Sequence, residues 1–553
     1  MLLFDSTRQP PPIHLAWVIL LCTAWTLLGL VGHDPWKPDE AYGFGLVYSI
    51  LNGGDWVVPM LAGEPFMEKP PLYYLTAAAF AKLFSGWLPL HDGARLASGF
   101  YMVLVLSFTG LTARELWGKG YGRITALIMI ACLGLLVRTH QLITDVALLA
   151  GFSIALHGLA LSPRRPVVAG IIAGTGIGIG FMAKGLIVPG VVGIAALLLP
   201  LLGRTWRSRG YLIFLALTFA AALPWLVIWP FLLYQRSPQL FMEWLWLNNL
   251  GRFAGFAHLG TTSNEHSYYL TILPWFAWPA LPMALWTLWR NRWKGWTTPA
   301  ILLPLTVFLL MLAVLSGASE GRDVYALPLL PPLAVLAAGT VDSLRRGAAN
   351  ALDWFSVMTF SLFALALWLG WYADLSGHPL VVAEWLHPQR PGFVTPFNGL
   401  ALLLALALSL AWLFVIFYVK RSNLRSVVNS ALGITLVWGL LATVWLPWLD
   451  VGKSYRGMIA SMQTALPKQY DCIASQNLGE PQRAMLHYFA GVVTQRVEIK
   501  PENKCQFLLT QGVAGVAGDV LDPSWRIIWT GSRLGDNDER FRLFERFGKI
   551  AAP

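Results

Sequence analysis

Two adjacent carboxylates, Asp39 and Glu40, stand directly after the first apolar segment of the chain. A carboxylate near a bilayer surface is a candidate general base or metal ligand, because desolvation raises its pKa towards useful values. The alternative is the start of a solvated loop, or a helix whose N-terminus is capped by Asp39. Asp145 is a further catalytic candidate, since it opens a later apolar segment and ionisable groups at membrane depth are costly.

Several basic and phenolic residues also stand near the ends of apolar segments. Lys69 lies among prolines and aromatic residues, where it can hold a lipid phosphate or extend to the lipid headgroups. Arg322 and Tyr325 open another apolar segment, although Arg322 can instead pair with its neighbour Asp323. Arg252 occupies a long connection. Ionisable residues in such places are functional candidates by default.

A metal site is a weaker hypothesis. His258 and His266, together with Glu68 or Glu265, could bind zinc, because imidazole and carboxylate groups suit that ion. No tight ligand spacing accompanies them, and surface histidines are the alternative. The sequence therefore allows a divalent metal without requiring one.

The four cysteines fall into two pairs. Cys22 and Cys132 stand in apolar segments, whereas Cys472 and Cys505 are the only pair in the polar C-terminal part. An oxidising compartment would favour a disulfide between Cys472 and Cys505, and two buried thiols are the alternative.

The glycine run at Gly174, Gly176, Gly178 and Gly180 resembles a nucleotide-binding loop only superficially. It stands inside an apolar segment, with no polar strand-to-helix turn around it. Its spacing predicts two small-residue stripes on which helices approach closely. No soluble nucleotide or nucleotide-sugar site is therefore expected.

Composition excludes a soluble globular protein. Of 553 residues, 56% are hydrophobic and 12% are charged, whereas a soluble domain carries about 25% charged residues. Charged residues are sparse over 1–449 and reach an ordinary density over 450–553. We therefore expect a transmembrane domain over 1–449, with a large first loop at 33–93, and a soluble domain over 450–553.

A membrane span requires roughly 20 apolar residues, somewhat fewer where it is short or broken. About 13 segments qualify, and they cover 14–32, 94–113, 124–139, 143–161, 167–183, 186–203, 211–233, 269–289, 299–316, 325–341, 354–373, 399–419 and 427–447. The stretch 72–83 is too short to span and is better interpreted as an interfacial helix.

The net charge of +11 is spread in twos and threes over alternate short connections, such as Arg164/Arg165 and Arg207/Arg209. This distribution indicates membrane topology rather than a nucleic-acid partner. By the positive-inside rule these connections are cytoplasmic, so the acidic candidates, the first loop and the C-terminal domain are expected outside, in the periplasm of a bacterium.

The C-terminal part predicts a small α/β domain. Strand-like runs cover 472–475, 507–510 and 526–530, and a helical pattern covers 480–490.

Four motifs together resemble one family. They are Asp-Glu after the first span, Lys-Pro-Pro-Leu-Tyr-Tyr at 69–74, Lys-Gly at 184–185, and Arg-Asp-x-Tyr-x-Leu-Pro-x-x-Pro from residue 322. The chain resembles, over its whole length, the GT-C class of membrane glycosyltransferases. Within that class it looks like the protein-mannosyltransferase-related branch, and most like the aminoarabinose transferases. Glu320-Gly321 departs from the usual pattern, since many relatives have a basic residue before the arginine.

The resemblance implies a mainly α, polytopic fold with a small periplasmic α/β domain. It also implies transfer of a sugar, 4-amino-4-deoxy-L-arabinose, from undecaprenyl phosphate to lipid A at the periplasmic face of the bacterial inner membrane. By matching position, Asp39 is then the acidic catalytic residue, and Lys69, Arg252 and Tyr325 hold the carrier phosphate, with Arg322 beside them.

Other functions remain as alternatives. One is transfer of another sugar to a protein or to another glycolipid. Another is a lipid flippase or transporter, which usually shows inverted repeats and broken helices at the midplane. A third is a sensor led by the C-terminal domain, although so many spans exceed what an anchor requires.

Overall fold

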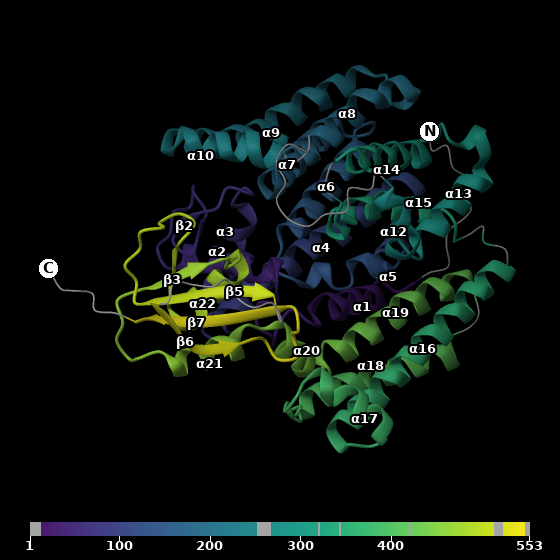
Figure 1. Cartoon of the computed structure of the whole chain (residues 1–553). Coiled ribbons are helices and arrows are strands. Elements are labelled where there is room, and N and C mark those ends of the chain that lie inside the picture. Colours follow the sequence, from purple (N-terminus) through teal and green to yellow (C-terminus); the bar gives the residue numbers. More distant parts are fainter. Residues whose placement is uncertain are drawn as a thin grey trace.

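Helices form most of the protein (Figure 1). The computed structural model describes residues 13–251, 267–318, 321–341, 344, 346–419, 422–513 and 524–547. Within these residues a helical bundle is followed by a C-terminal sheet that lies beside it in Figure 1.

Eight helices of the described residues are long and apolar enough to cross a membrane. They are α4 (Leu90–Trp117), α6 (Thr144–Leu161), α7 (Pro166–Lys184), α9 (Arg209–Arg236), α14 (Pro299–Gly317), α16 (Arg346–Ser376), α18 (Gly399–Tyr418) and α19 (Asn423–Leu441). A ninth span results if α5 (Tyr121–Ala131) and the 3-10 turns of 133–140, which bend by 64°, are taken together.

The remaining expected spans are helical but shorter or broken. Three apolar stretches are shorter than the helices counted as membrane spans. They are α1 (Leu15–Leu27), α8 (Ile187–Leu202), and η5 (Asp323–Leu329) with α15 (Leu330–Ala338). The expected span 269–289 is divided into α12 (Tyr268–Phe276) and α13 (Ala280–Gly295). Pro279 stands between them, and a residue before proline avoids the helical region.

The glycine run packs helices together, as its spacing predicted. A Cβ added at Gly176 would meet the backbone of Ala155 in α6 at 2.5 Å, and one at Gly178 would meet the Trp225 ring of α9. Small residues therefore allow α6, α7 and α9 to approach at backbone distance.

The connection 33–93 is itself folded. It contains α2 (Asp39–Leu51), a short hairpin of β1 (Met60–Leu61) and β2 (Glu64–Pro65), and α3 (Leu72–Phe84). The helix expected at 72–83 is thus present as α3. A helix starting at Asp39 was one of the alternatives for this segment, and it is present as α2, which begins at the first candidate carboxylate.

The C-terminal sheet has the strand order β4-β3-β5-β7-β6. Its elements are α21 (Arg456–Ala465), β3 (Ile473–Gln476), α22 (Glu480–Ala490), β4 (Gln495–Arg496), β5 (Phe507–Val513), β6 (Trp525–Gly531) and β7 (Glu539–Arg546), preceded by α20 (Leu446–Lys453). β3 is parallel to β4 and β5, and β7 is antiparallel to β5 and β6. The elements match the expected α/β pattern, while the domain boundary at 449–450 stays a prediction.

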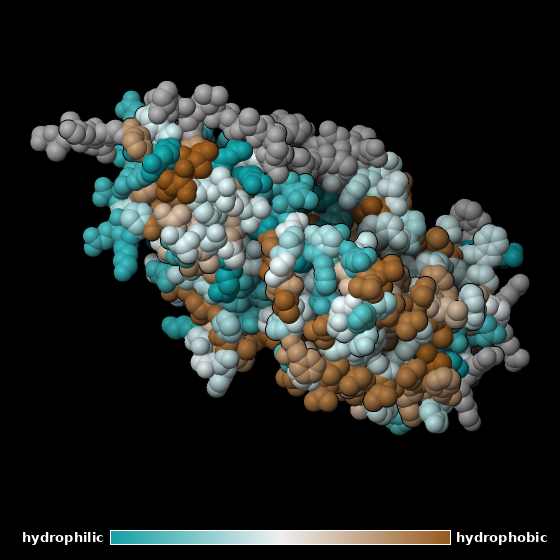
Figure 2. Space-filling model, turned by 60° about the horizontal axis from the view of Figure 1, so that its bottom comes forward, coloured by the Kyte–Doolittle hydropathy of each residue, from teal (hydrophilic) through white to brown (hydrophobic). Residues whose placement is uncertain are grey.

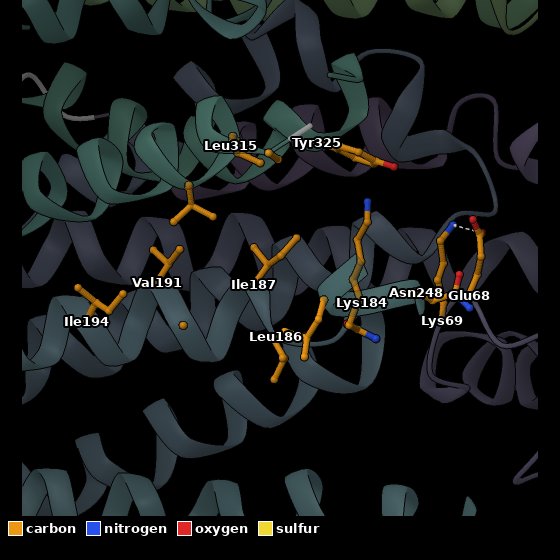
Figure 3. Close-up of a pocket in the computed structure, with 15 residues that line it drawn as sticks. Glu68, Lys69, Lys184, Leu186, Ile187, Val191, Ile194, Asn248, Leu315 and Tyr325 are labelled. Atoms are coloured by element: carbon orange, nitrogen blue, oxygen red, sulfur yellow. Dashed lines mark ion pairs between the residues drawn. The ribbon is translucent and has the colours of Figure 1, made fainter. Parts of the chain in front are cut away.

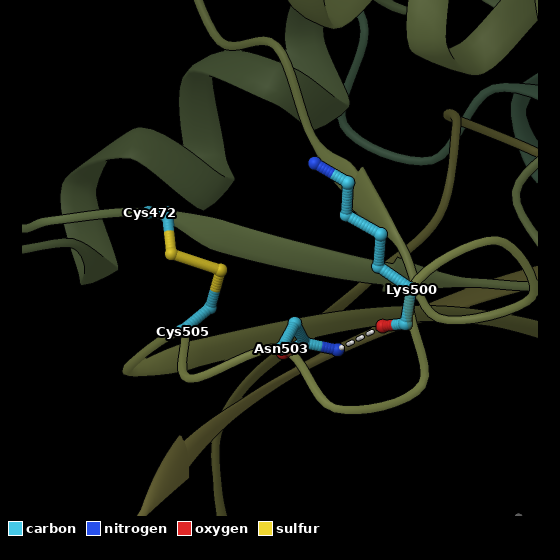
Figure 4. The surroundings of a disulfide bond; sticks show 4 residues. All are labelled: Cys472, Lys500, Asn503 and Cys505. Carbon is cyan, nitrogen blue, oxygen red and sulfur yellow. Dashed lines mark hydrogen bonds between the residues drawn. A yellow bond between two sulfur atoms is a disulfide. The ribbon is translucent and has the colours of Figure 1, made fainter.

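A disulfide joins Cys472, directly before β3, to Cys505, shortly before β5 (Figure 4), with an S–S distance of 2.06 Å. Further along, α22 packs on α2, where the side chain of Ala484 lies against Gly45. Arg483 and Arg496 both form ion pairs with Glu64 of β2, at 2.8 and 3.2 Å. The C-terminal part is thereby fastened to the first connection.

Apolar side chains gather over part of the surface (Figure 2). On α18 they include Leu403, Leu410, Phe414 and Phe417, which are between 59% and 76% exposed. So large an exposed apolar surface is typical of a lipid-facing helix.

The other short helical elements are η1 (Leu133–Leu135), η2 (Arg138–His140), η3 (Arg204–Trp206), α10 (Pro238–Met242), η4 (Glu243–Gly251), α17 (Leu380–Leu386) and η6 (His387–Gln389).

Candidate active site

Asp39 occupies the first position of α2, and its carboxylate faces Arg322. The Nη2 group of Arg322 donates to both carboxylate oxygens of Asp39, at 3.0 and 2.7 Å. Asp39 is thus bound by an arginine that is 283 positions away in the sequence rather than capping its own helix. The expected alternative of a local pair between Arg322 and Asp323 is not what the structure contains.

The charge of Asp39 is set by opposing effects. Burial raises the pKa of this carboxyl, but the Arg322 guanidinium and the Lys69 ammonium lower it further than burial raises it. The net pKa lies below its ordinary value, so Asp39 is an anion at neutral pH.

Asp323 binds a different arginine. Arg138, in η2, donates to both carboxylate oxygens of Asp323 at 2.9 Å, and its Nε group adds a third contact at 3.1 Å. This forked pair fixes the start of η5, the element that carries Tyr325. No motif surrounds Arg138 in the sequence, so its role becomes visible only in the structure.

Lys184 and Asp145 form an ion pair at one end of two neighbouring helices. Lys184 ends α7 and Asp145 lies in the first turn of α6. The other ends of α6 and α7 are joined by the short basic connection at Arg164 and Arg165. The ammonium of Lys184 also lies 3.7 Å from the centre of the Tyr325 ring, a cation–π contact.

A cavity of about 310 Å³ opens beside these groups (Figure 3). Its polar lining consists of Glu68, Lys69, Lys184, Asn248, Asn249 and Tyr325. Figure 3 shows Lys184 pointing towards Tyr325, while Ile187, Val191 and Ile194 follow one another along α8. With Val314 and Leu315 of α14 they form an apolar wall. The cavity is therefore polar at one end and apolar along its length.

Lys69 is held at the polar end by hydrogen bonds and charge. Its ammonium donates to the hydroxyl of Tyr42 at 2.6 Å and lies 3.9 Å from the carboxylate of Glu68. Burial disfavours the charged form of Lys69, but neighbouring phenol and carboxyl groups outweigh it, and the net pKa is raised. A protonated lysine thus faces the cavity.

Glu40 does not share the site of Asp39. Its side chain is fully buried, and Oε1 accepts from Arg95 Nε at 2.5 Å and from the backbone N–H of Leu142 at 3.3 Å. Adjacent residues on a helix point in different directions, which explains why the two carboxylates separate. The geometry assigns Glu40 to fixing α2 against α4 and the start of α6 rather than to a catalytic role. Arg95 could not be recognised from the sequence.

Other candidates cannot be placed. Arg252, His258, Glu265 and His266 lie outside the described residues, so the role of Arg252 and the zinc hypothesis stay predictions. Within the described residues, no group of three or more His, Cys, Asp or Glu side chains is arranged to hold a metal ion.

Similar proteins were found by sequence. No family model matches the chain. It is 30% identical over 370 residues to the undecaprenyl phosphate-alpha-4-amino-4-deoxy-L-arabinose arabinosyl transferase of Pseudomonas aeruginosa, covering 64% of each chain. It is 28% identical over 392 residues to the enzyme of the same name from Edwardsiella ictaluri, covering 66% of this chain and 67% of that one. The chain thus spans somewhat less than two thirds of the length of the first relative.

Two solved structures share the fold. The crystal structure of ArnT from Cupriavidus metallidurans bound to undecaprenyl phosphate matches 98% of this chain and 100% of that chain, with a TM-score of 0.69 and 16% identity. The apo structure matches with a TM-score of 0.70 and 17% identity. These matches confirm the expected fold class: a mainly α membrane protein with a small C-terminal sheet domain.

Proposed function

We propose that the protein is a glycosyltransferase that moves 4-amino-4-deoxy-L-arabinose from undecaprenyl phosphate to lipid A, at the periplasmic face of the bacterial inner membrane. The observation that carries this proposal is the cavity between α8 and α14, which combines two lysines at its polar end with an apolar wall. The names of the two relatives, both undecaprenyl phosphate-aminoarabinose transferases, support the choice of sugar and carrier.

The cavity suits a lipid-linked phosphate. An isoprenoid chain presents only hydrocarbon, which the side chains of Ile187, Val191 and Leu315 accommodate. The phosphate requires cations, and Lys69 and Lys184 supply them with the Tyr325 hydroxyl nearby. The donor would therefore bind with its phosphate at the polar end of the cavity and its isoprenoid chain along the apolar wall.

The reaction then requires mainly that the negative charge developing on the carrier phosphate be stabilised. An oxygen of the acceptor phosphate forms a bond to the anomeric carbon while the bond from that carbon to the carrier phosphate breaks. The electron pair leaves with the carrier phosphate, which gains one negative charge, and an acceptor phosphate dianion loses one. Lys69 and Lys184 stabilise the charge that develops on the leaving group.

Asp39 serves as an anion in this scheme. An acceptor phosphate needs no proton removed, so a general base is not required. A carboxylate that remains ionised stabilises positive charge at the anomeric carbon or orients the acceptor. Arg322 holds the Asp39 carboxylate in one orientation through two hydrogen bonds.

Asp145 orients the Lys184 ammonium in this scheme. When no phosphate is bound, the carboxylate of Asp145 satisfies the ammonium. A carrier phosphate would compete for the same ammonium. We therefore assign Asp145 to holding a cation ready for the carrier, not to proton transfer.

Mass spectrometry of lipid A from cells with and without the gene tests the proposal. The expected result is a mass increment of one pentosamine per modified phosphate, present with the wild-type gene and absent with the Asp39→Asn variant expressed at equal level. Lipid A of unchanged mass, in cells shown to contain the donor lipid, would contradict the assignment. A different increment would point to another sugar.

A further inference from the structure

Two basic residues, Lys453 and Arg390, lie together where the bundle meets the C-terminal part. Lys453 ends α20, and its ammonium lies 4.7 Å from the centre of the Trp36 ring. The guanidinium of Arg390 lies 4.6 Å from the centre of the Trp448 ring, also in α20. The Arg390 guanidinium also packs against Gly452, the residue before Lys453. A Cβ at position 452 would collide with this guanidinium, so glycine is what allows the close approach.

Neither cation has a carboxylate partner among the described residues. No ion pair joins Lys453 or Arg390 to an acidic side chain there, and the Nε group of Arg390 is buried without a hydrogen-bond acceptor. Burial lowers the pKa of Lys453, and the like charges of Arg138 and Arg390 lower it further. An unsatisfied buried donor beside a second cation is a site suited to an anion.

The carboxylates nearby are already engaged. Asp536 and Glu539 both bind Lys37, each at 3.3 Å, and both also bind Arg533.

Asp450 is engaged as well. Its Oδ1 atom accepts from the Trp36 indole N–H at 2.8 Å and from the Asp34 backbone N–H at 3.0 Å. Burial and the neighbouring Asp34 raise the pKa of Asp450 to about 6. Oδ1 of Asp450 thus already has two donors, and no ion pair joins Asp450 to Lys453 or Arg390 in the described part of the chain.

The cluster adjoins the candidate catalytic carboxylate. Trp36 stands three residues before Asp39, and its carbonyl accepts from the backbone N–H of Ala41 in the first turn of α2. Arg138 is close enough to lower the pKa of both Asp39 and Lys453. None of Lys453, Arg390 and Arg138 lines the carrier cavity.

We infer that Lys453 and Arg390, with Arg138 towards Asp39, bind the phosphate of the acceptor glycolipid. This inference rests on the proposed function and names the acceptor subsite of the same site. It explains why a transferase with a phosphate acceptor has a second set of cations, separate from those at the carrier cavity. It also gives the C-terminal part a role in the reaction, because α20 and Trp36 together present Lys453.

Binding measurements on the full-length protein in detergent test the inference without requiring turnover. Lipid A and lipid A stripped of its phosphates are titrated separately into wild type, Lys453→Gln, Arg390→Gln and the double variant. Lys468→Gln, an exposed lysine of the C-terminal part, is the matched control. We expect wild type to prefer phosphorylated lipid A, and each single variant to lose about tenfold or more of that affinity. Lys453→Arg should recover part of the loss.

Two further measurements distinguish the lipid A phosphate from other phosphates that could bind the same cations. Inorganic phosphate and phosphatidylglycerol are used as competitors, and undecaprenyl phosphate is titrated as a second ligand. The expected results are weak competition by both competitors and unchanged affinity for undecaprenyl phosphate in all variants. Unchanged lipid A affinity in the double variant would overturn the inference, as would displacement by phosphatidylglycerol at equal concentration. A wild type that binds lipid A through Lys453 yet transfers no sugar would instead refute the proposed function alone.

Discussion

The guanidinium of Arg322 binds both oxygens of the Asp39 carboxylate through one nitrogen, at 3.0 and 2.7 Å. This contact joins the start of α2 to the segment before η5, two parts of the chain separated by 283 positions. A charge-assisted contact in a partly buried site fixes both the orientation and the ionisation of the carboxylate. The pair therefore determines over which pH range Asp39 can act as an anion.

Arg322→Gln is expected to move the acidic limb of the pH profile. In wild type, the arginine contributes to a pKa of Asp39 below its ordinary value, so transfer should decline only under strongly acidic conditions. Without the arginine, burial raises the pKa, and activity should fall already at a higher pH. The measurement is kcat/KM against pH in a reconstituted assay with defined donor and acceptor.

Arg138→Gln is compared with Arg322→Gln in the position of the acidic limb alone, because Arg138 also lowers the pKa of Asp39 but does not bind it. It should shift the acidic limb less than Arg322→Gln. Equal shifts in both variants, or none in either, would mean that direct contact with Arg322 does not set the ionisation of Asp39.

Lys184→Ala and Lys69→Ala are expected to weaken undecaprenyl phosphate binding. Each removes a cation from the polar end of the cavity, and a charge-assisted contact contributes about 1.5–3 kcal/mol. The dissociation constant should rise by about tenfold or more in each variant. Lys82→Ala, at an exposed position of α3, should bind the carrier as wild type does. A carrier affinity that survives both substitutions would move the phosphate site elsewhere.

The sequence predicted the helices better than the contacts between them. An apolar run long enough to enter a membrane must be helical, because lipid cannot satisfy its backbone hydrogen bonds. Every expected span proved helical at least in part. Their lengths were less accessible, since the break at Pro279 and the bend after α5 depend on packing. Helix α2 was only one of the alternatives at Asp39, because its composition is not apolar enough to resemble a span and its polar start resembles a loop.

The candidate site shows the same limit. Ionisable residues at membrane depth are few, so Asp145 could be found from the cost of placing a charge there, whereas the roles of Asp39, Lys69 and Tyr325 were implied by the family resemblance. Their partners could not, because the contact between Asp39 and Arg322 joins distant segments. Nothing in the adjacency of Asp39 and Glu40 indicated that Glu40 points into the protein towards Arg95.

Asp450→Asn is expected to stabilise the protein at neutral pH. The folded protein raises the pKa of Asp450 from 3.8 to about 6, so the native state binds this proton more tightly than the unfolded chain. The contribution of Asp450 to stability is then complete below pH 3.8 and is lost as pH rises through 6. Asparagine keeps the acceptor oxygen for Trp36 and removes the charge.

The melting temperature measured at pH 5 and pH 8 tests this expectation. At pH 8 the variant should melt roughly 1–3 °C above wild type, whereas near pH 5 the difference should shrink. A variant that is destabilised equally at both pH values would contradict the expectation, because the loss would then not depend on the charge of Asp450.

The orientation of the protein is expected to follow its basic connections. Single cysteines are introduced at Lys468 and at Arg207, in a background where Cys22 and Cys132 are replaced by alanine. An impermeant thiol reagent applied to intact spheroplasts should label position 468 and leave position 207 unlabelled until the membrane is opened. The reverse pattern would place the candidate site in the cytoplasm and remove the proposed access to lipid A.

Asp39→Asn is expected to abolish most of the transfer without loss of the donor. Asparagine keeps the size of the side chain and can still accept a hydrogen bond from Arg322, but it carries no charge to stabilise the anomeric centre. We expect the transfer rate to fall by about 100-fold or more, with undecaprenyl phosphate affinity close to wild type because Lys69 and Lys184 are intact. Glu40→Gln should instead lower the melting temperature, since it leaves the buried guanidinium of Arg95 without its full charge partner. Near-normal transfer by Asp39→Asn in the reconstituted assay would leave this residue as an anchor for Arg322 and make Asp145 the next carboxylate to substitute.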